Sequence, residues 1–165
     1  MLARFAAIAG FLLILAACSN NPADQGAGVG GPGGPGGVGG AGAPQYGPGS
    51  QQDLAATAGD RIFFAFDSSD ISSEAQQILQ RQAQWLKRYP NVSVTIEGHC
   101  DERGTREYNL ALGERRAQAA KNVLAALGVP ASRLSTISYG KERPAVPGGS
   151  DEANAQNRRA VTTVN

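Results

Sequence analysis

Hydrophobic positions beyond residue 60 switch between a strand period and a helix period. A continuous apolar run at 61–66 (RIFFAF) is typical of a strand covered on both faces. Apolar residues then recur every 3.6 positions over 73–89, which predicts an amphipathic helix that a preceding serine caps and Pro90 ends. The segment 92–98 (VSVTIEG) alternates apolar and polar side chains, so it predicts a second strand.

The second half of this region continues the alternation. A longer helix is predicted over about 105–127, with Gly128 at its end. Three further elements are predicted, a strand at 134–140 (LSTISYG), a short helix at 151–157 (DEANAQN) and a closing strand at 158–164 (RRAVTTV). The predicted order is β-α-β-α-β-(α)-β. This order favours an α/β sandwich, in which helices pack over a mixed sheet.

The N-terminal segment follows neither period. Residues 1–17 combine Arg4 with an apolar run too short to span a bilayer, a pattern typical of a signal peptide. The run closes on LAAC, and small residues before a cysteine resemble the lipobox of bacterial lipoproteins. That resemblance implies that Cys18 is lipidated and begins the mature chain, and Ser19 after it favours the outer membrane. Several acyl chains would then anchor the protein durably.

Composition separates a tether from a folded domain. Glycine and proline dominate 26–50, which offers almost nothing to bury, so 18–59 is expected to be a disordered tether that carries the lipidated Cys18. The remaining residues, 60–165, suffice for one domain with its own core. A formal net charge of +1 and the absence of a basic run argue against a nucleic-acid partner.

The stretch EGHCDERGTREYN, 97–109, holds the densest chemistry in the chain. A metal site is not expected, because His99, Cys100, Asp101 and Glu102 are consecutive and neighbours on a strand point to opposite faces. For the same reason Cys100 and His99 diverge and do not form a nucleophile and base. Acidic pairs in loops are usually solvated, so neither an enzyme nor a cofactor is expected.

Two residues instead suggest a binding pocket. Asp101 lies at the mouth of a strand-to-helix loop, which Gly104 allows to turn tightly. Arg116 falls within the apolar stripe of the following helix, where a guanidinium is costly unless an anion meets it. A carboxylate and a guanidinium facing one cleft suit a zwitterionic ligand. A plain Asp101–Arg116 salt bridge explains the same pattern, and the residues leave both alternatives open.

Several segments together resemble the OmpA-like C-terminal domain family over essentially all of 60–165. They are FFAFDSSDIS, IEGHCDERGTREYNLALGERRAQAAKNVLAALGV, ISYGKERPAV and NRRAV, in that order. The resemblance implies non-covalent binding of peptidoglycan through the diaminopimelate of its stem peptide. It also implies that Asp101 takes the ligand's amino group and Arg116 its carboxylate. The other residues that it places at the site are Phe66, Asp67, Glu102, Arg103, Thr105, Asn109 and Leu112.

The same resemblance implies a cellular setting. The domain would lie in the periplasm below the outer membrane and would bind peptidoglycan and proteins of the Tol system, including its periplasmic propeller protein, in envelope integrity and cell division. His99 is expected to orient the loop, and Cys100 to be a small packed residue. Two alternatives remain, a purely structural lipoprotein that binds only protein partners and a peptidoglycan-cleaving enzyme.

Overall fold

The structure is a computed structural model that describes residues 46–165. In chain order its elements are α1 (Gln51–Thr57), β1 (Arg61–Phe63), α2 (Ser73–Arg88), β2 (Val94–His99), α3 (Arg106–Ala126), the 3-10 helix η1 (Ala131–Arg133), β3 (Leu134–Gly140), α4 (Asp151–Asn157) and β4 (Arg159–Val164). The predicted α/β sandwich is confirmed. The predictions of a signal peptide and of a lipidated Cys18 lie outside the described residues.

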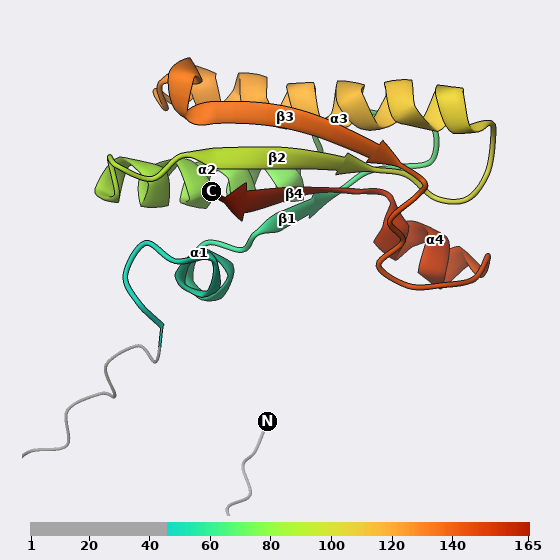
Figure 1. Ribbon diagram of the computed structural model, residues 1–165, viewed down its shortest axis with the longest axis horizontal. Helices are drawn as coiled ribbons and strands as arrows, with labels where there is room; N and C mark the ends of the chain where they lie inside the picture. The colour runs from blue at the N-terminus through green and yellow to red at the C-terminus, as the bar shows by residue number, and fades with distance from the viewer. Residues whose placement is uncertain (1–45) are drawn as a thin grey trace, which may run out of the picture. The chain divides into compact units, whose positions relative to one another are not determined.

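Four strands form one mixed sheet in the order β1-β4-β2-β3 (Figure 1). β2 and β3 run parallel, whereas β4 runs antiparallel to both β2 and β1. The parallel pair is possible because α3 makes the crossover between β2 and β3. The carboxyl ends of β2 and β3 therefore reach the same end of the sheet, on the right in Figure 1.

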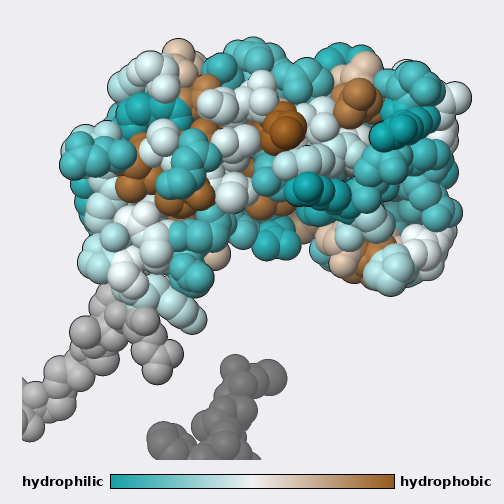
Figure 2. All heavy atoms as spheres, in the orientation of Figure 1, coloured by the Kyte–Doolittle hydropathy of each residue, from teal (hydrophilic) through white to brown (hydrophobic). Residues whose placement is uncertain are grey.

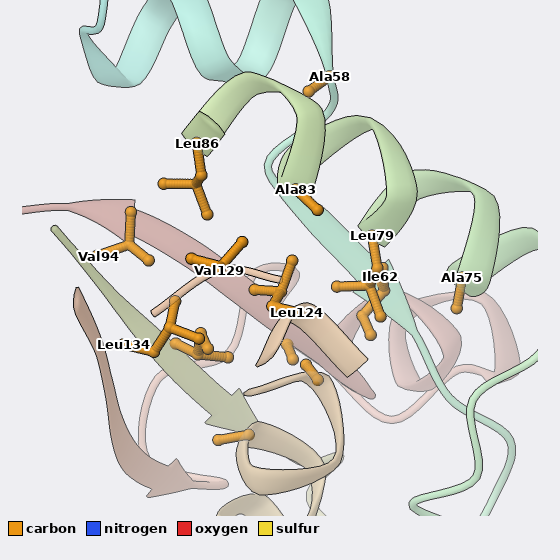
Figure 3. Close-up of a cluster of buried hydrophobic side chains, with 14 of the residues drawn as sticks. Ala58, Ile62, Ala75, Leu79, Ala83, Leu86, Val94, Leu124, Val129 and Leu134 are labelled. Carbon is orange, nitrogen blue, oxygen red and sulfur yellow. The ribbon is translucent and has the colours of Figure 1, made fainter. Parts of the chain in front are cut away.

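The core lies between one face of the sheet and the helices α2 and α3. Side chains that alternate along β1, β2 and β3 meet the apolar stripes of the two helices there (Figure 3). Burial of this apolar surface is the main stabilising contribution to the fold. The largest contributors are fully buried aliphatic residues, namely Ile62, Val94, Ile96, Leu79, Leu86 and Leu124.

The first strand is shorter than predicted. β1 ends at Phe63, whose partner Arg159 is the first residue of β4; one more cross-strand bond follows, from the Phe64 N–H to the Arg158 carbonyl, before the chain leaves the sheet. β1 is also an edge strand, and only Ile62 of its three residues is buried. Phe63 and Phe66 remain 41% and 61% exposed, so the apolar run 61–66 does not mark a buried strand along its whole length.

The predicted tether 18–59 also needs correction, because its last part is folded. Ser50 caps α1, and Leu54 within this helix is fully buried in the core. The carboxylate of Asp53 accepts hydrogen bonds from the Gly49 N–H and from the indole N–H of Trp85, both at 3.0 Å. These bonds hold α1 against α2. A helix of seven residues with one leucine is too short to show a helix period in the sequence.

Gly98 sets how closely α3 approaches the sheet. A Cβ at this position would collide with the backbone carbonyl of Gly113 on α3. We expect Gly98→Ala to lower the free energy of unfolding by about 1–3 kcal/mol, because the helix must shift to relieve the overlap. Urea denaturation measures this loss. Gly47→Ala is the matched control, since a Cβ there meets nothing within 4 Å. An equal loss in both variants would contradict the close-approach explanation.

Candidate ligand-binding site

A pocket of about 140 Å³ opens beyond the carboxyl end of β2, between the β1–α2 loop and the start of α3. Seven of the nine residues expected at the site line it, namely Phe66, Asp67, Asp101, Arg103, Asn109, Leu112 and Arg116. Glu102 and Thr105 are not among its lining residues. Thr105 instead caps α3, its hydroxyl accepting from the Tyr108 N–H, whereas Glu102 is exposed.

Arg116 is fully buried, as the helix period predicts, and it joins two loops. Its guanidinium donates to the carbonyls of Ser68 at 2.8 Å, His99 at 2.9 Å and Ala65 at 3.1 Å. A guanidinium carries five N–H groups, so two are not used by these bonds. Burial lowers the pKa of Arg116. No carboxylate of the described residues pairs with it within 4.0 Å, so its direct hydrogen-bond partners are carbonyl oxygens, while the charges of Asp101 and Asp67 act on it from a greater distance.

Asp101 has other ionic partners. Its carboxylate accepts from the guanidinium and the backbone N–H of Arg103, and from the guanidinium of Arg158 at 3.3 Å. Burial alone would raise the pKa of Asp101, but these hydrogen bonds outweigh it and the pKa is lowered. Asp101 is thus ionised at neutral pH. Among the described residues, Asp101 and Arg116 do not form a salt bridge. The plain Asp101–Arg116 salt bridge that the sequence left open is therefore not present.

Arg158 is a site residue that sequence reasoning missed. Besides pairing with Asp101, it donates to the Phe64 carbonyl at 3.0 Å and so fixes the strand end beside the pocket. It lies in the segment NRRAV, but 57 residues separate it from Asp101 in the chain. Only the pairing of β4 between β1 and β2 brings it to the pocket.

The pocket rim is aromatic and polar. The Arg103 guanidinium lies 4.1 Å from the centroid of the Phe66 ring, within the range of a cation–π contact. The hydroxyl of Tyr108, a lining residue that the sequence did not indicate, donates to Asp67. Asn109 donates to the Arg103 carbonyl at 2.7 Å and thereby holds the β2–α3 loop. These contacts pre-organise the charged groups at the pocket mouth.

His99 is buried and has a structural role. His99 is 2% exposed, and neither ring nitrogen has a hydrogen-bond partner among the described residues. Burial, with the nearby charges of Arg159 and Arg143, lowers the pKa of His99 to about 4. It is therefore neutral at pH 7, and Glu97 at 3.5 Å is not an ionic partner. Its link to the loop is its backbone carbonyl, which Arg116 holds.

Cys100 is a packed residue, as predicted. It is 3% exposed, and its thiol donates to the Asn109 carbonyl at 3.3 Å. Burial raises its pKa, which disfavours the reactive thiolate.

Within 46–165, no three His, Cys, Asp or Glu side chains are grouped so that they could hold a metal ion. No helix in the same range has the length and apolarity needed to cross a membrane.

Comparison with known proteins identifies the family to which this chain belongs. The model of the OmpA family matches residues 63–158, more than half of the chain. The chain belongs to the OmpA family. The match includes both loops of the pocket and ends at Arg158, so all the residues that line the pocket lie within the matched region.

Individual proteins with similar sequences support this family assignment. The chain is 63% identical over 117 residues to the peptidoglycan-associated lipoprotein of Agrobacterium fabrum, covering 71% of this chain and 66% of the relative. It is 42% identical to the protein of that name from Pasteurella multocida, covering 93% and 92%. The chain thus spans just under two thirds of the Agrobacterium relative's length, but nearly all of the Pasteurella one.

Solved OmpA-family structures share the fold. The crystal structure of the peptidoglycan-associated lipoprotein from Burkholderia pseudomallei is 42% identical with a TM-score of 0.63, covering 64% of this chain and 90% of that one. The C-terminal domain of Helicobacter pylori MotB is 26% identical with a TM-score of 0.61, covering 64% and 84%. The sheet and helices described above are therefore those of the family.

Proposed function

We propose that this protein is an outer-membrane lipoprotein that binds peptidoglycan non-covalently and links the membrane to the cell wall. The observation that carries the proposal is the pocket that both an ionised Asp101 and a buried Arg116 line. The names of the relatives, peptidoglycan-associated lipoproteins at 42–63% identity, support it. The domain supplies the grip on the wall, and lipidated Cys18 supplies the membrane anchor.

The ligand group that this pocket suits is the diaminopimelate of the stem peptide. Its side chain ends in an ammonium and a carboxylate on one carbon, and these charges match Asp101 and Arg116. The two N–H groups of Arg116 not used by protein carbonyls are available to the carboxylate. Arg158 and Arg103 keep Asp101 ionised and in place for the ammonium. Asp101 is engaged by the guanidinium groups of Arg103 and Arg158, an arrangement that suits a charged ligand, and we propose binding rather than cleavage.

Proteins of the Tol system, including its periplasmic propeller protein, are proposed as further partners. The basis is the resemblance of 60–165 to the OmpA-like family. A lipoprotein that binds only such protein partners is the competing function. Binding to the wall distinguishes the two, because only the proposed function requires contact with peptidoglycan.

Co-sedimentation with purified sacculi tests the proposal. The purified full-length protein in detergent should pellet with sacculi and release from them on washing with denaturant, as expected for non-covalent binding. No soluble muropeptides should appear on prolonged incubation. Failure to pellet would favour a partner role restricted to proteins, and released muropeptides would show an enzyme.

The lipid anchor gives a separate prediction. Cys18→Ser removes the thiol that the lipobox LAAC offers for acylation, so the protein should move from the membrane fraction to the soluble fraction. Cys100→Ser is the matched control, because that cysteine is buried in the domain. Fractionation followed by immunoblotting measures the change. Unchanged membrane retention of the Cys18 variant would contradict lipidation at this residue.

A further inference from the structure

β3 forms a sheet edge of unusual character. It is seven residues long, and its sequence LSTISYG carries no charge and no proline. Natural edge strands are generally short, charged or interrupted by proline, since unpaired backbone groups would otherwise pair with other chains. The opposite edge of this sheet follows that rule, because β1 has three residues and begins with Arg61. β3 is neither short, charged nor interrupted by proline, and its register with β2 shifts only at Tyr139, near its carboxyl end.

A groove runs beside this edge, between β3 and α3. It has a volume of about 580 Å³ and includes two exposed apolar side chains, Leu110 at 49% and Ile137 at 39%. A second hollow of about 390 Å³ shares Leu110 and Ser138 with it and extends it toward Tyr139. On the face shown in Figure 2, brown hydrophobic patches lie isolated among teal and white ones. Leu110 projects from α3, whereas Ile137 lies on the sheet face away from α3, because its neighbours Thr136 and Ser138 contact α3. An unpaired strand with exposed apolar side chains beside it can accept an added strand.

The charges along the groove point to a basic occupant. Glu107 and Glu114 line it, and the described residues provide neither with an ionic partner within 4.0 Å. The one guanidinium that lines the neighbouring hollow, that of Arg106, is paired with Glu142 at 3.3 Å. The groove therefore carries excess negative charge next to apolar surface.

A second copy of this chain fits the groove poorly. Pairing two β3 strands antiparallel about Ile137 would also place the two α3 helices antiparallel. Ser138 contacts the Leu110 carbonyl and Thr136 contacts Glu114, so β3 and α3 run in opposite directions side by side. The symmetric pair would therefore set Leu110 of one copy opposite Glu114 of the other. It would also gather the groove carboxylates of both copies, Glu107 and Glu114, along one seam, which is electrostatically unfavourable.

We propose that β3 and this groove bind an extended segment of a partner protein, whose alternate side chains are apolar and basic. The segment would add as a fifth strand beside β3. Its lysines or arginines would point toward α3, where their ammonium or guanidinium groups meet Glu107 and Glu114 and their aliphatic stems cover Leu110. Its apolar side chains would point to the other face of the sheet and cover Ile137. This surface lies on the opposite side of α3 from the pocket, whose α3 residues are Tyr108, Asn109, Leu112 and Arg116. It is therefore independent of the proposed peptidoglycan site.

A synthetic peptide tests the proposal. The probe is acetyl-Lys-Val-Thr-Val-Lys-Val-Thr-amide, and the comparison peptide has glutamate in place of both lysines. The basic peptide should bind the full-length protein with a dissociation constant below about 1 mM and slow amide hydrogen exchange along β3. The acidic peptide should bind at least tenfold more weakly. Absence of β3 protection at saturating basic peptide would overturn the proposal.

Two variants locate the contact. Ile137→Lys adds a charge to the edge and should weaken binding of the basic peptide at least tenfold. Phe63→Lys is the matched control, since Phe63 has nearly the same exposure, 41%, on the other edge strand. Its affinity should stay unchanged, and both variants should keep the wild-type melting temperature. Equal weakening by the two variants would overturn the location, and a concentration-dependent dimer that Ile137→Lys abolishes would place a second copy in the groove instead.

Discussion

Asp101→Asn is expected to weaken binding to purified sacculi by about thirtyfold or more. Removing one charge of a buried, hydrogen-bonded pair typically costs about 2 kcal/mol or more, which corresponds to that factor. In this pocket the loss is compounded, because the guanidinium groups of Arg103 and Arg158 remain and would repel the ligand's ammonium. The measurement is the bound fraction as a function of sacculus concentration.

The matched control is Asp60→Asn. It makes the same chemical change at a carboxylate that pairs with Arg61, away from the pocket. Its sacculus binding should equal that of the wild type. If Asp101→Asn bound as well as this control, the ammonium would not be held by Asp101.

A test of Arg116 needs a substitution that keeps a cation near the three carbonyls to which this side chain donates. The side chain holds three backbone carbonyls in two loops, so truncation to alanine would leave buried acceptors unpaired and lower stability. Arg116→Lys keeps the cation, but an ammonium cannot bond three carbonyls and a carboxylate in the same fork geometry. We expect weaker sacculus binding by the folded protein together with a lower melting temperature.

Coupling separates a shared ligand from two independent effects. The double variant Asp101→Asn, Arg116→Lys should bind little worse than the weaker single variant, because both residues act on one zwitterion. Sacculi in which the diaminopimelate carboxyl is amidated should bind the wild type more weakly and affect Arg116→Lys less. Equal weakening of both proteins by amidation would show that this carboxylate does not meet Arg116.

The second large effect concerns stability and pH. The pKa of His99 is about 4 in the folded protein, against about 6.5 for an unperturbed histidine. Above pH 6.5 the imidazole is neutral in both states, so its contribution to stability is fully present. As the pH falls below 6.5, the unfolded chain binds a proton that the folded protein excludes. The free energy of unfolding should therefore fall by roughly 1 kcal/mol per pH unit, and by about 3 kcal/mol near pH 4.

Urea denaturation at several pH values between 7.5 and 4.5 measures this slope. The groups that face His99 are Tyr139, Glu97, Arg143 and Arg159, and neither arginine titrates in this window. The lowered pKa values of Asp53 and Asp101 place their contributions at more acidic pH. His99→Gln should remove most of the slope between pH 6.5 and 4.5, whatever its stability at pH 7.5. An unchanged slope would assign the dependence to other groups.

Regular elements with a clear period were predictable from the sequence. The helix over 73–89 and the longer helix at 105–127 match α2 and α3 within a residue or two, and the strand at 134–140 matches β3. Periodicity works there because each element buries one face over several turns or residues. The same logic placed Arg116 inward, since a helix wheel fixes direction without knowledge of the partner.

Elements whose order depends on distant contacts were not predictable. α1 owes its place to the bond from Trp85 to Asp53 and to the burial of Leu54, and neither shows as a pattern within seven residues. β1 stops at Phe63 because its partner strand β4 begins at Arg159, the residue opposite Phe63, which the apolar run 61–66 does not reveal.

The sequence by itself determined the fold class, the family, and the two charges from which the pocket is built. The fold class follows from local periodicity, the two charges from one loop and one helix, and the family from the resemblance of several segments in order. Only the tertiary structure decided which cations surround Asp101, that Arg116 is held by carbonyls of two loops, and that β3 leaves an uncharged edge open. These facts depend on strand order, because it sets which residues far apart in the chain become neighbours, and no local pattern encodes that order.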